Sequence, residues 1–298
     1  MNILLTGGTG FIGSLLVKEL IRKEYHCYVV TRSHTDSQIP QVTFITWEQL
    51  TSNSFDEPIN VVINLAGESI NSGRWTNSVK DKILQSRIQS TSKLITWLER
   101  QAHRPNLLIN ASAIGFYGTS ETKTFTENDK PKSTDFLATT VRTWENVATK
   151  AEELGIRTVL ARFGIVLGIE GGALPKMILP YKLFIGGPIG SGSQWMSWIH
   201  LKDVVGLIVH SIENKEIHGP MNFVSPTPVT MKEFSEILSK SLNRPNLLKV
   251  PEFALQMLLG EMSMLILEGQ KVSPTVAIQT NYNFQFTSLK DALDYTLK

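Results

Sequence analysis

The stretch TGGTGFIG, residues 6–13, follows a short apolar run, NILLT, and opens a segment with apolar residues at helical spacing, FIGSLLVKELIRK. Two glycine spacings fit it: Gly7, Gly10 and Gly13, or Gly8, Gly10 and Gly13. In either, one glycine lets the chain turn sharply, another lets the backbone approach a phosphate, and the last lets the helix pack on the strand. Because the helix N-terminus then faces negative charge, the stretch predicts a dinucleotide-phosphate site rather than an ordinary glycine-rich turn.

Outward from this loop, strand-like and helix-like patterns alternate. Further strands are expected at CYVVT (27–31), VTFIT (42–46), INVVINLA (59–66), NLLINAS (106–112) and RTVLARFGIVLG (157–168). Long helices are expected at about 78–100, 135–154 and 203–212. This alternation predicts an α/β fold, a Rossmann-type doubly wound parallel sheet with helices on both faces.

After about Leu167 the pattern becomes irregular, with a Gly/Ser-rich loop, GGPIGSGS, at 186–193 and a strand-like MNFVS at 221–225. Thr230 followed by Glu233 predicts a capped helix start. We expect a nucleotide-binding domain over 1–215 and a small, mostly helical C-terminal domain over 216–298. Placed at the carboxyl ends of the strands, the second domain would wall a substrate pocket.

Composition excludes several classes of partner. The 298 residues carry 29 Lys plus Arg and 27 Asp plus Glu, a net charge of +2, without the basic surplus of a nucleic-acid binder. The single cysteine, Cys27, cannot form an internal disulfide and falls in a predicted strand, which favours a buried, inert thiol. The six histidines show no HxH or HxxxH spacing, so we expect no metal site.

No secretory signal is expected at the N-terminus, which opens directly into the first strand. The longest apolar stretch, FALQMLLGEMSMLILEG (253–269), is interrupted by polar residues and by Gly260, and is shorter than the ~20 residues of a membrane span. It is expected to form a buried helix or the contact helix of a homodimer. The expectation is a cytoplasmic protein with no membrane partner.

The second strand decides between the two nicotinamide cofactors. It ends in TRS (31–33), with no acidic residue to bind the ribose 2′-hydroxyl of NAD. Arg32 is instead suited to a 2′-phosphate, so NADP(H) is the expected cofactor. The fourth strand ends in small residues, and Leu65, Ala66 and Gly67 would let that cofactor lie close to the backbone.

Several longer motifs together resemble the extended short-chain dehydrogenase/reductase superfamily, and within it the atypical epimerase-family proteins. They are LAGESINSGRW (65–75), K-x-x-I-x-x-S-R (80–87), SAIGFYG (112–118), GGPIGSG (186–192), SWIHLKD (197–203) and LLGEMSMLILEGQKVSP (258–274). The resemblance implies an NADP-binding Rossmann domain and a small C-terminal domain of unassigned function. It implies cofactor contacts at Gly7, Thr9, Gly10, Phe11, Ile12, Gly13, Thr31, Arg32, Leu65, Ala66, Lys82, Arg87 and Val166.

The chain departs from that superfamily at its acid/base pair, a Tyr and a Lys four residues later. None of its six tyrosines has a lysine at that offset, and Leu137 and Val141 stand in those places. Ser112 and Tyr117 are the catalytic candidates, with His200 a third polar residue nearby. Each also has a structural interpretation: a strand-end hydroxyl bonded to backbone, a packed aromatic, and a histidine bonded to Asp203 or backbone.

The residues around Met196 also predict a substrate other than the nucleotide sugars usual in the superfamily. Met196 replaces the arginine that commonly holds a substrate diphosphate, and Trp195 and Trp198 favour an apolar, aromatic pocket unless they pack in the core. Two hypotheses follow, besides a structural protein with a vestigial glycine loop. One is an NADP(H)-dependent oxidoreductase or epimerase-like enzyme with an atypical active site and an unknown small-molecule substrate. The other is a non-catalytic NADPH-binding sensor or regulatory protein.

Overall fold

The computed structural model describes residues 1–33, 37–52, 54–71, 73–131 and 133–298. Within these ranges, seven parallel strands form one sheet in the order β11-β7-β5-β4-β1-β2-β3. They are β1 (Asn2–Thr6), β2 (His26–Thr31), β3 (Val42–Thr46), β4 (Val61–Asn64), β5 (Leu107–Ala113), β7 (Arg157–Phe163) and β11 (Gly219–Phe223). The order reverses beside β1, and the doubly wound parallel α/β fold is confirmed.

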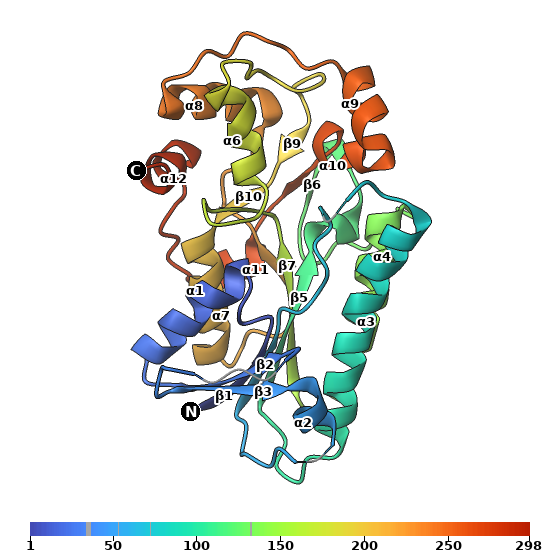
Figure 1. The fold of residues 1–298 in the computed structure, drawn as a ribbon, viewed down its shortest axis with the longest axis vertical. Coiled ribbons are helices and arrows are strands. Elements are labelled where there is room, and N and C mark those ends of the chain that lie inside the picture. The colour runs from blue at the N-terminus through green and yellow to red at the C-terminus, as the bar shows by residue number, and fades with distance from the viewer. Residues whose placement is uncertain (34–36, 53, 72, 132) are drawn as a thin grey trace.

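Apolar cores lie on both faces of the sheet because successive side chains of a strand point to opposite sides. Ile3 and Leu5 pack toward one core, whereas Leu4 packs toward the other. The first core is covered by α1 (Phe11–Arg22) and α7 (Leu201–Glu213). On the other face lie α2 (Trp47–Thr51), α3 (Asn77–Glu99), α4 (Phe136–Ala148) and α5 (Lys150–Glu153) (Figure 1).

The expected single strand over 157–168 is wrong, because the chain leaves the main sheet at Gly164. After β7, a separate strand β8 (Ile165–Leu167) pairs in parallel with β10 (Trp198–His200). A Cβ on Gly164 would lie 2.4 Å from the carbonyl oxygen of Ser197, so two backbones cross closely there. Only glycine leaves room for that crossing.

The remaining elements gather beyond the carboxyl ends of the strands and along one side (Figure 1). They are η1 (Ile114–Tyr117), β6 (Ser120–Phe125), α6 (Leu174–Lys182), β9 (Trp195–Met196), β12 (Val229–Thr230), α8 (Met231–Leu242), α9 (Glu252–Leu259), η2 (Gly260–Ser263), α10 (Met264–Leu267), β13 (Gln270–Val272), α11 (Thr275–Gln279) and α12 (Leu289–Thr296). The capped start of α8 is confirmed, since Thr230 and Glu233 form a reciprocal capping box.

The expected domain boundary after residue 215 falls between α7 and β11, ahead of the last strand of the main sheet. A third core joins the two sides of that boundary. It packs Trp198 and Ile178 against Phe234 of α8 and Leu293 of α12. The division of the chain into two domains therefore stays a prediction.

The apolar stretch 253–269 is not a buried helix, which corrects one of its two expected roles. It folds as α9, η2 and α10, and no residue of α9 is buried. Phe253, Met257 and Leu258 are 66%, 75% and 72% exposed. The homodimer contact stays a prediction. No helix in the described ranges is both long and apolar enough to cross a membrane.

Cys27 lies where the sequence predicts it. Cys27 is a buried free thiol in β2, and its burial raises its pKa to about 11, which keeps it protonated and unreactive at neutral pH. Among the described residues, no group of three or more His, Cys, Asp or Glu side chains is placed to hold a metal ion.

Candidate functional site

The glycine loop turns at Gly7 and closes on Gly13. Gly7 has a φ of 71°, and a Cβ there would lie 2.8 Å from the carbonyl carbon of Leu65. A Cβ on Gly13 would lie 2.2 Å from the carbonyl oxygen of Gly7, whereas Gly8 abuts only side chains, with Val29 the nearest. This geometry favours the Gly7-Gly10-Gly13 spacing and brings the start of α1 against the ends of β1 and β4.

The N-terminus of α1 leaves its first backbone N–H groups without a side-chain cap. Gly10 is its N-cap, without a side-chain cap, and its first turn contains no acidic residue. The N–H of Gly10 donates to the carbonyl of Gly7 at 3.0 Å, which orders the loop. The N–H groups of Phe11, Ile12 and Gly13 begin the helix, where no intrahelical carbonyl can accept from them. Thr9 is exposed beside them.

A second glycine-rich segment, residues 168–172, encloses the ring of Phe11. Cβ atoms on Gly168, Gly171 and Gly172 would lie 2.8, 2.9 and 3.0 Å from that ring. Gly172 also lies against the carbonyl oxygen of Val166, 3.2 Å from its ideal Cβ position. The loop after β8 thereby joins Phe11 to Val166. This segment was not identified from the sequence, although three of its five residues are glycine.

At the end of β2, the hydroxyl of Thr31 donates to backbone carbonyls of Ser33 at 2.7 Å and Ile45 at 3.3 Å. The next side chain, Arg32, is exposed at the carboxyl edge of the sheet. Because β1 and β2 are adjacent, this tip lies one strand away from the glycine loop. Its described residues, 31–33, include no acid to contact a ribose 2′-hydroxyl.

The end of β4 is held by a buried polar network. The Thr6 hydroxyl donates to Asn64 Oδ1 at 2.6 Å and accepts from the N–H of Ala66 at 3.2 Å. Asn64 donates in turn to Asn110 Oδ1 at 2.6 Å. These bonds tie β1, β4 and β5 together and fix the backbone that follows β4.

The two α3 residues implied by the resemblance lie on different sides of the helix. Arg87 reaches back over Gly67, and its Nη1 donates to the carbonyls of Glu68 and Ile83 at 2.9 Å each. Burial of the guanidinium lowers the pKa of Arg87 to about 10. Lys82 is exposed. Because it is five residues from Arg87, its side chain lies about 140° around the helix from that of Arg87.

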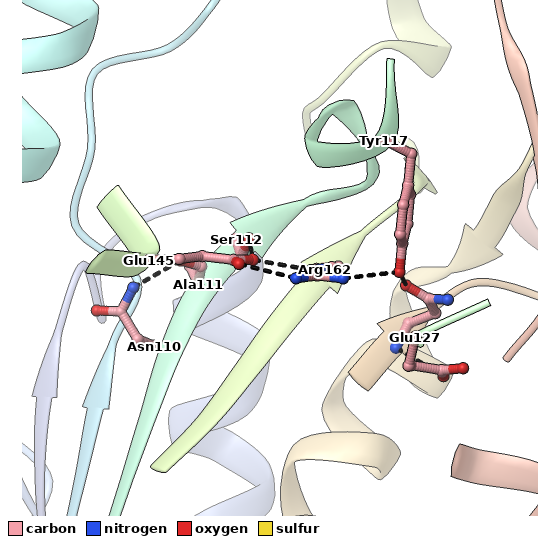
Figure 2. A network of polar contacts seen from close by, with 8 residues as sticks. Asn110, Ala111, Ser112, Tyr117, Glu127, Glu145 and Arg162 are labelled. Carbon is pink, nitrogen blue, oxygen red and sulfur yellow. Dashed lines mark hydrogen bonds and ion pairs between the residues drawn. The ribbon is translucent and has the colours of Figure 1, made fainter. Parts of the chain in front are cut away.

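Ser112 and Tyr117 belong to one buried polar network (Figure 2). The Ser112 hydroxyl donates to Glu145 Oε1 at 2.5 Å, and Arg162 donates to both Glu145 oxygens at 2.8 Å. Arg162 Nη1 also donates to the Tyr117 hydroxyl at 2.9 Å, which donates to Asn222 Oδ1 at 2.7 Å. All of these side chains are buried.

This network occupies the hydroxyls of both catalytic candidates. Burial raises the pKa of Tyr117 to about 12, against the opposing influence of Arg162, so the phenol stays protonated at neutral pH. The partner of Ser112 is a carboxylate, not the backbone group that its structural interpretation proposed. The catalytic roles of Ser112 and Tyr117 remain predictions.

Sequence reasoning missed Glu145, Arg162 and Asn222 as members of this network. The network continues through Asn222, whose N–H donates to Glu127 Oε1 at 3.1 Å. A charged residue inside the apolar strand TVLARF was the available signal, because a buried charge in a protein is almost always paired.

His200 has the structural role that was one of its interpretations. Its Nδ1 accepts from the N–H of Lys202 at 3.2 Å at the start of α7, and its Nε2 lies 3.1 Å from the Thr296 hydroxyl. Burial lowers the pKa of His200 to about 4. Asp203 is not its partner; that carboxylate accepts from the N–H groups of Gln285 and Phe286.

The two tryptophans separate. Trp198 is fully buried in the third core and donates to the carbonyl of Thr227 at 2.9 Å, so it packs rather than lines a pocket. Trp195 is only partly buried, donates to the carbonyl of Glu121 at 2.8 Å and has Lys271 over its ring.

The sheet order, the glycine loop and the lobe over the strand ends define a nucleotide-binding Rossmann protein of the extended short-chain dehydrogenase/reductase class. The chain belongs to the NAD dependent epimerase/dehydratase family, whose model matches residues 3–223. A further model, a domain of unknown function (DUF1731), matches residues 250–296.

Similar proteins span nearly the whole chain. Epimerase family protein YfhF of Bacillus subtilis is 46% identical and aligns over 98% of this chain and 97% of its own length. A crystal structure of human epimerase family protein SDR39U1 (isoform 2) with NADPH is 32% identical, covers 99% of both chains and has a TM-score of 0.91. UDP-glucuronic acid 4-epimerase from Bacillus cereus, crystallised with NAD, is 17% identical with a TM-score of 0.78 and shares the fold.

Proposed function

We propose that this chain binds NADP(H) at the carboxyl edge of its sheet and acts on a small molecule as an oxidoreductase or epimerase-like enzyme that lacks the Tyr-x-x-x-Lys pair. The observation that carries the proposal is the closure of Gly13 on the Gly7 carbonyl, which opens an uncapped, acid-free helix N-terminus to a phosphate. The human relative crystallised with NADPH supports the choice of cofactor.

The residues present fit this cofactor. The loop residues Gly7, Thr9, Gly10, Phe11, Ile12 and Gly13 would hold the pyrophosphate, with Leu65, Ala66 and Gly67 alongside. Thr31 and Arg32 would hold the 2′-phosphate, because an exposed guanidinium stands where an NAD-specific site has an acid. Val166, Lys82 and Arg87 complete the proposed set. When bound, the cofactor supplies hydride chemistry, and the protein supplies orientation.

Proton transfer falls to Ser112 or Tyr117 in this proposal, or to a water held beside them. Both hydroxyls are bonded within the Glu145–Arg162 network, which holds their positions. Enzyme variants Ser112→Ala and Tyr117→Phe test the roles separately, through isotope exchange at nicotinamide C4 with a panel of carbonyl compounds. Exchange by the wild type that is lost in one variant supports that residue.

A second candidate function is favoured by the same network. Because both hydroxyls already have buried partners and Tyr117 has a raised pKa, the site also suits a protein that binds NADPH without turning it over. Such a sensor would show tight NADPH binding and no isotope exchange with any carbonyl compound in the panel.

The binding proposal is tested by calorimetric titration with NADPH and NADH. We expect wild-type protein to prefer NADPH by about tenfold or more, the value of one charge-assisted contact, and Arg32→Gln to lose that preference while keeping NADH affinity. Arg22→Gln, an exposed arginine at the far end of α1, is the matched control. Equal affinity of the wild type for both cofactors would refute the NADP(H) assignment.

A further inference from the structure

Arg87 lies in an unusual environment at the junction of β4, α3 and α4. Its Cζ would be 3.4 Å from a Cβ on Gly67, and it lies 5.1 Å from the centre of the Trp144 ring. Of its donors, Nη1 bonds the carbonyls of Glu68 and Ile83. Nε and Nη2 make no hydrogen bond to any described residue. The guanidinium is thus positioned by backbone and by an aromatic face.

Among the described residues, Arg87 forms no ion pair, although the nearby Glu68 carboxylate favours its charged form. No carboxylate of the described residues, that of Glu68 included, lies within ion-pair distance of the guanidinium. By contrast, the other buried arginine of this region, Arg162, has a bidentate partner in Glu145. Arg87 Nε and Nη2 have no protein partner among the described residues and are not fully buried, so they are open to a ligand. Burial lowers the pKa of Arg87 only to about 10, so the guanidinium is still charged at neutral pH.

The strand order predicts which part of a bound dinucleotide would lie near the Arg87 charge. In such a sheet the pyrophosphate lies at the end of β1, and the adenosine ribose lies at the end of the next strand on one side, here β2. The other half of the dinucleotide therefore extends toward β4 and β5. Arg87 lies over Gly67, just past the end of β4, and faces α4. It is on the nicotinamide side of the crevice.

On the basis of the proposed function, we infer that Arg87 faces the nicotinamide half of the cofactor and selects its reduced form over its oxidised form. The nicotinamide ring of NADP⁺ carries a positive charge, whereas that of NADPH is neutral. A guanidinium without an ion-pair partner repels the first and tolerates the second. With an effective dielectric constant of about 20 and a separation of about 12 Å, this repulsion amounts to about tenfold in affinity.

The test measures dissociation constants of NADPH, NADP⁺ and the fragment 2′,5′-ADP for wild-type protein and three variants. Wild type is expected to bind NADPH about tenfold more tightly than NADP⁺. Arg87→Gln should bring that ratio close to one, whereas Arg87→Lys should keep most of it because the charge remains. Arg100→Gln, in which the substituted arginine is the C-cap of α3, more than three turns from Arg87, should keep the wild-type ratio. The 2′,5′-ADP fragment, which lacks nicotinamide, should bind all four proteins equally.

Several results would overturn the inference. An unchanged ratio in folded Arg87→Gln would show that this charge does not sense the ring. Weaker binding of 2′,5′-ADP to Arg87→Gln, by as much as NADPH weakens, would place Arg87 at the phosphates. If Arg87→Gln does not fold, equal affinities of NADPH and NADP⁺ for wild type still refute the selection. If the wild type binds NADPH and NADP⁺ with equal affinity, this inference alone is wrong. If the wild type binds neither dinucleotide, the proposed function is wrong as well.

Discussion

At the scale of single residues, Arg162 joins the elements that meet at the end of the sheet. It stands on β7, pairs with Glu145 of α4 and donates to Tyr117 of η1, while its guanidinium lies 3.5 Å from the centre of the Phe116 ring. Both charged side chains are buried, so the pair stabilises the fold only as long as each partner is present. Loss of one partner leaves a buried charge without compensation.

Glu145→Ala is therefore expected to lower the free energy of unfolding by about 3–5 kcal/mol. Urea denaturation at neutral pH measures it. Glu19→Ala, which breaks the exposed pair between Glu19 and Arg22 on α1, is the matched control and should have a much smaller effect. Similar losses in the two variants would mean that the buried pair contributes no more than a surface pair.

Tyr117 gives a prediction in alkaline solution. Its pKa is raised from 10.0 to about 12, so the unfolded chain releases this proton at lower pH than the folded protein does. The stabilisation is therefore complete below about pH 10 and is lost as the pH rises toward about 12. Between about pH 9 and pH 11, wild type should lose about 1 kcal/mol more than Tyr117→Phe does. Parallel pH profiles for the two proteins would contradict this burial effect.

Individual site residues were predictable only where the signal is local. The glycine loop could be identified because its glycines and the flanking strand and helix are neighbours in sequence. The partners of Tyr117 could not, because Asn222 is 105 positions away and no periodicity links them. Ser112 was singled out for its place at a strand end, but its carboxylate partner on α4 depends on how helix and sheet pack.

At the scale of elements, the junction between β1 and α1 depends on the absence of a side chain at Gly13. Gly13→Ala would place a methyl group 2.2 Å from the Gly7 carbonyl oxygen, so the helix start must move away from the loop. Such overpacking costs about 1–3 kcal/mol, and we expect NADPH affinity to fall by about tenfold or more. Titration calorimetry and thermal unfolding report the two effects.

Gly73→Ala is the matched control for that experiment. Apart from its neighbours in the chain, no atom of the described residues lies within 4 Å of a Cβ built on Gly73, so its substitution should change neither affinity nor stability appreciably. If Gly13→Ala bound NADPH as wild type does, the close contact of α1 with the loop would not be required for binding.

The boundaries of the helices and strands show where sequence patterns predict the structure correctly and where they do not. The capping box at Thr230 and Glu233 was predictable, since its signal is contained in four residues. The end of β7 was not, because Gly164 leaves the sheet to pass the backbone of Ser197, which is distant in sequence. The apolar composition of 253–269 suggested burial, but no residue of α9 is buried, and Phe253 and Met257 are 66% and 75% exposed.

At the scale of the whole molecule, the segments on either side of residue 215 share a core. Trp198 and Ile178 pack with Phe234 and Leu293, and β11 completes the main sheet. Because neither side can bury its apolar surface alone, we expect a single cooperative unfolding transition. Tryptophan fluorescence and far-ultraviolet circular dichroism should give coincident denaturation curves, whereas two separate transitions would indicate that residues 216–298 fold as an independent domain.

The overall architecture was predictable because alternating strands and helices determine a doubly wound sheet through rules that hold for every such fold. The arrangement of the residues over the strand ends was less predictable. Short strands and loops there are held by single contacts, such as those of Asp203 with the N–H groups of Gln285 and Phe286. Those contacts link residues that no local pattern connects.

The central claim, that the carboxyl edge of this sheet holds NADP(H), is tested most directly by a crystal structure of the protein with NADPH. We predict electron density for the pyrophosphate at the start of α1, for the 2′-phosphate at Thr31 and Arg32, and for the nicotinamide beyond Gly67 beside Arg87. Crystals grown with saturating NADPH that show no dinucleotide density at this edge would contradict the account, as would a dinucleotide bound elsewhere on the molecule.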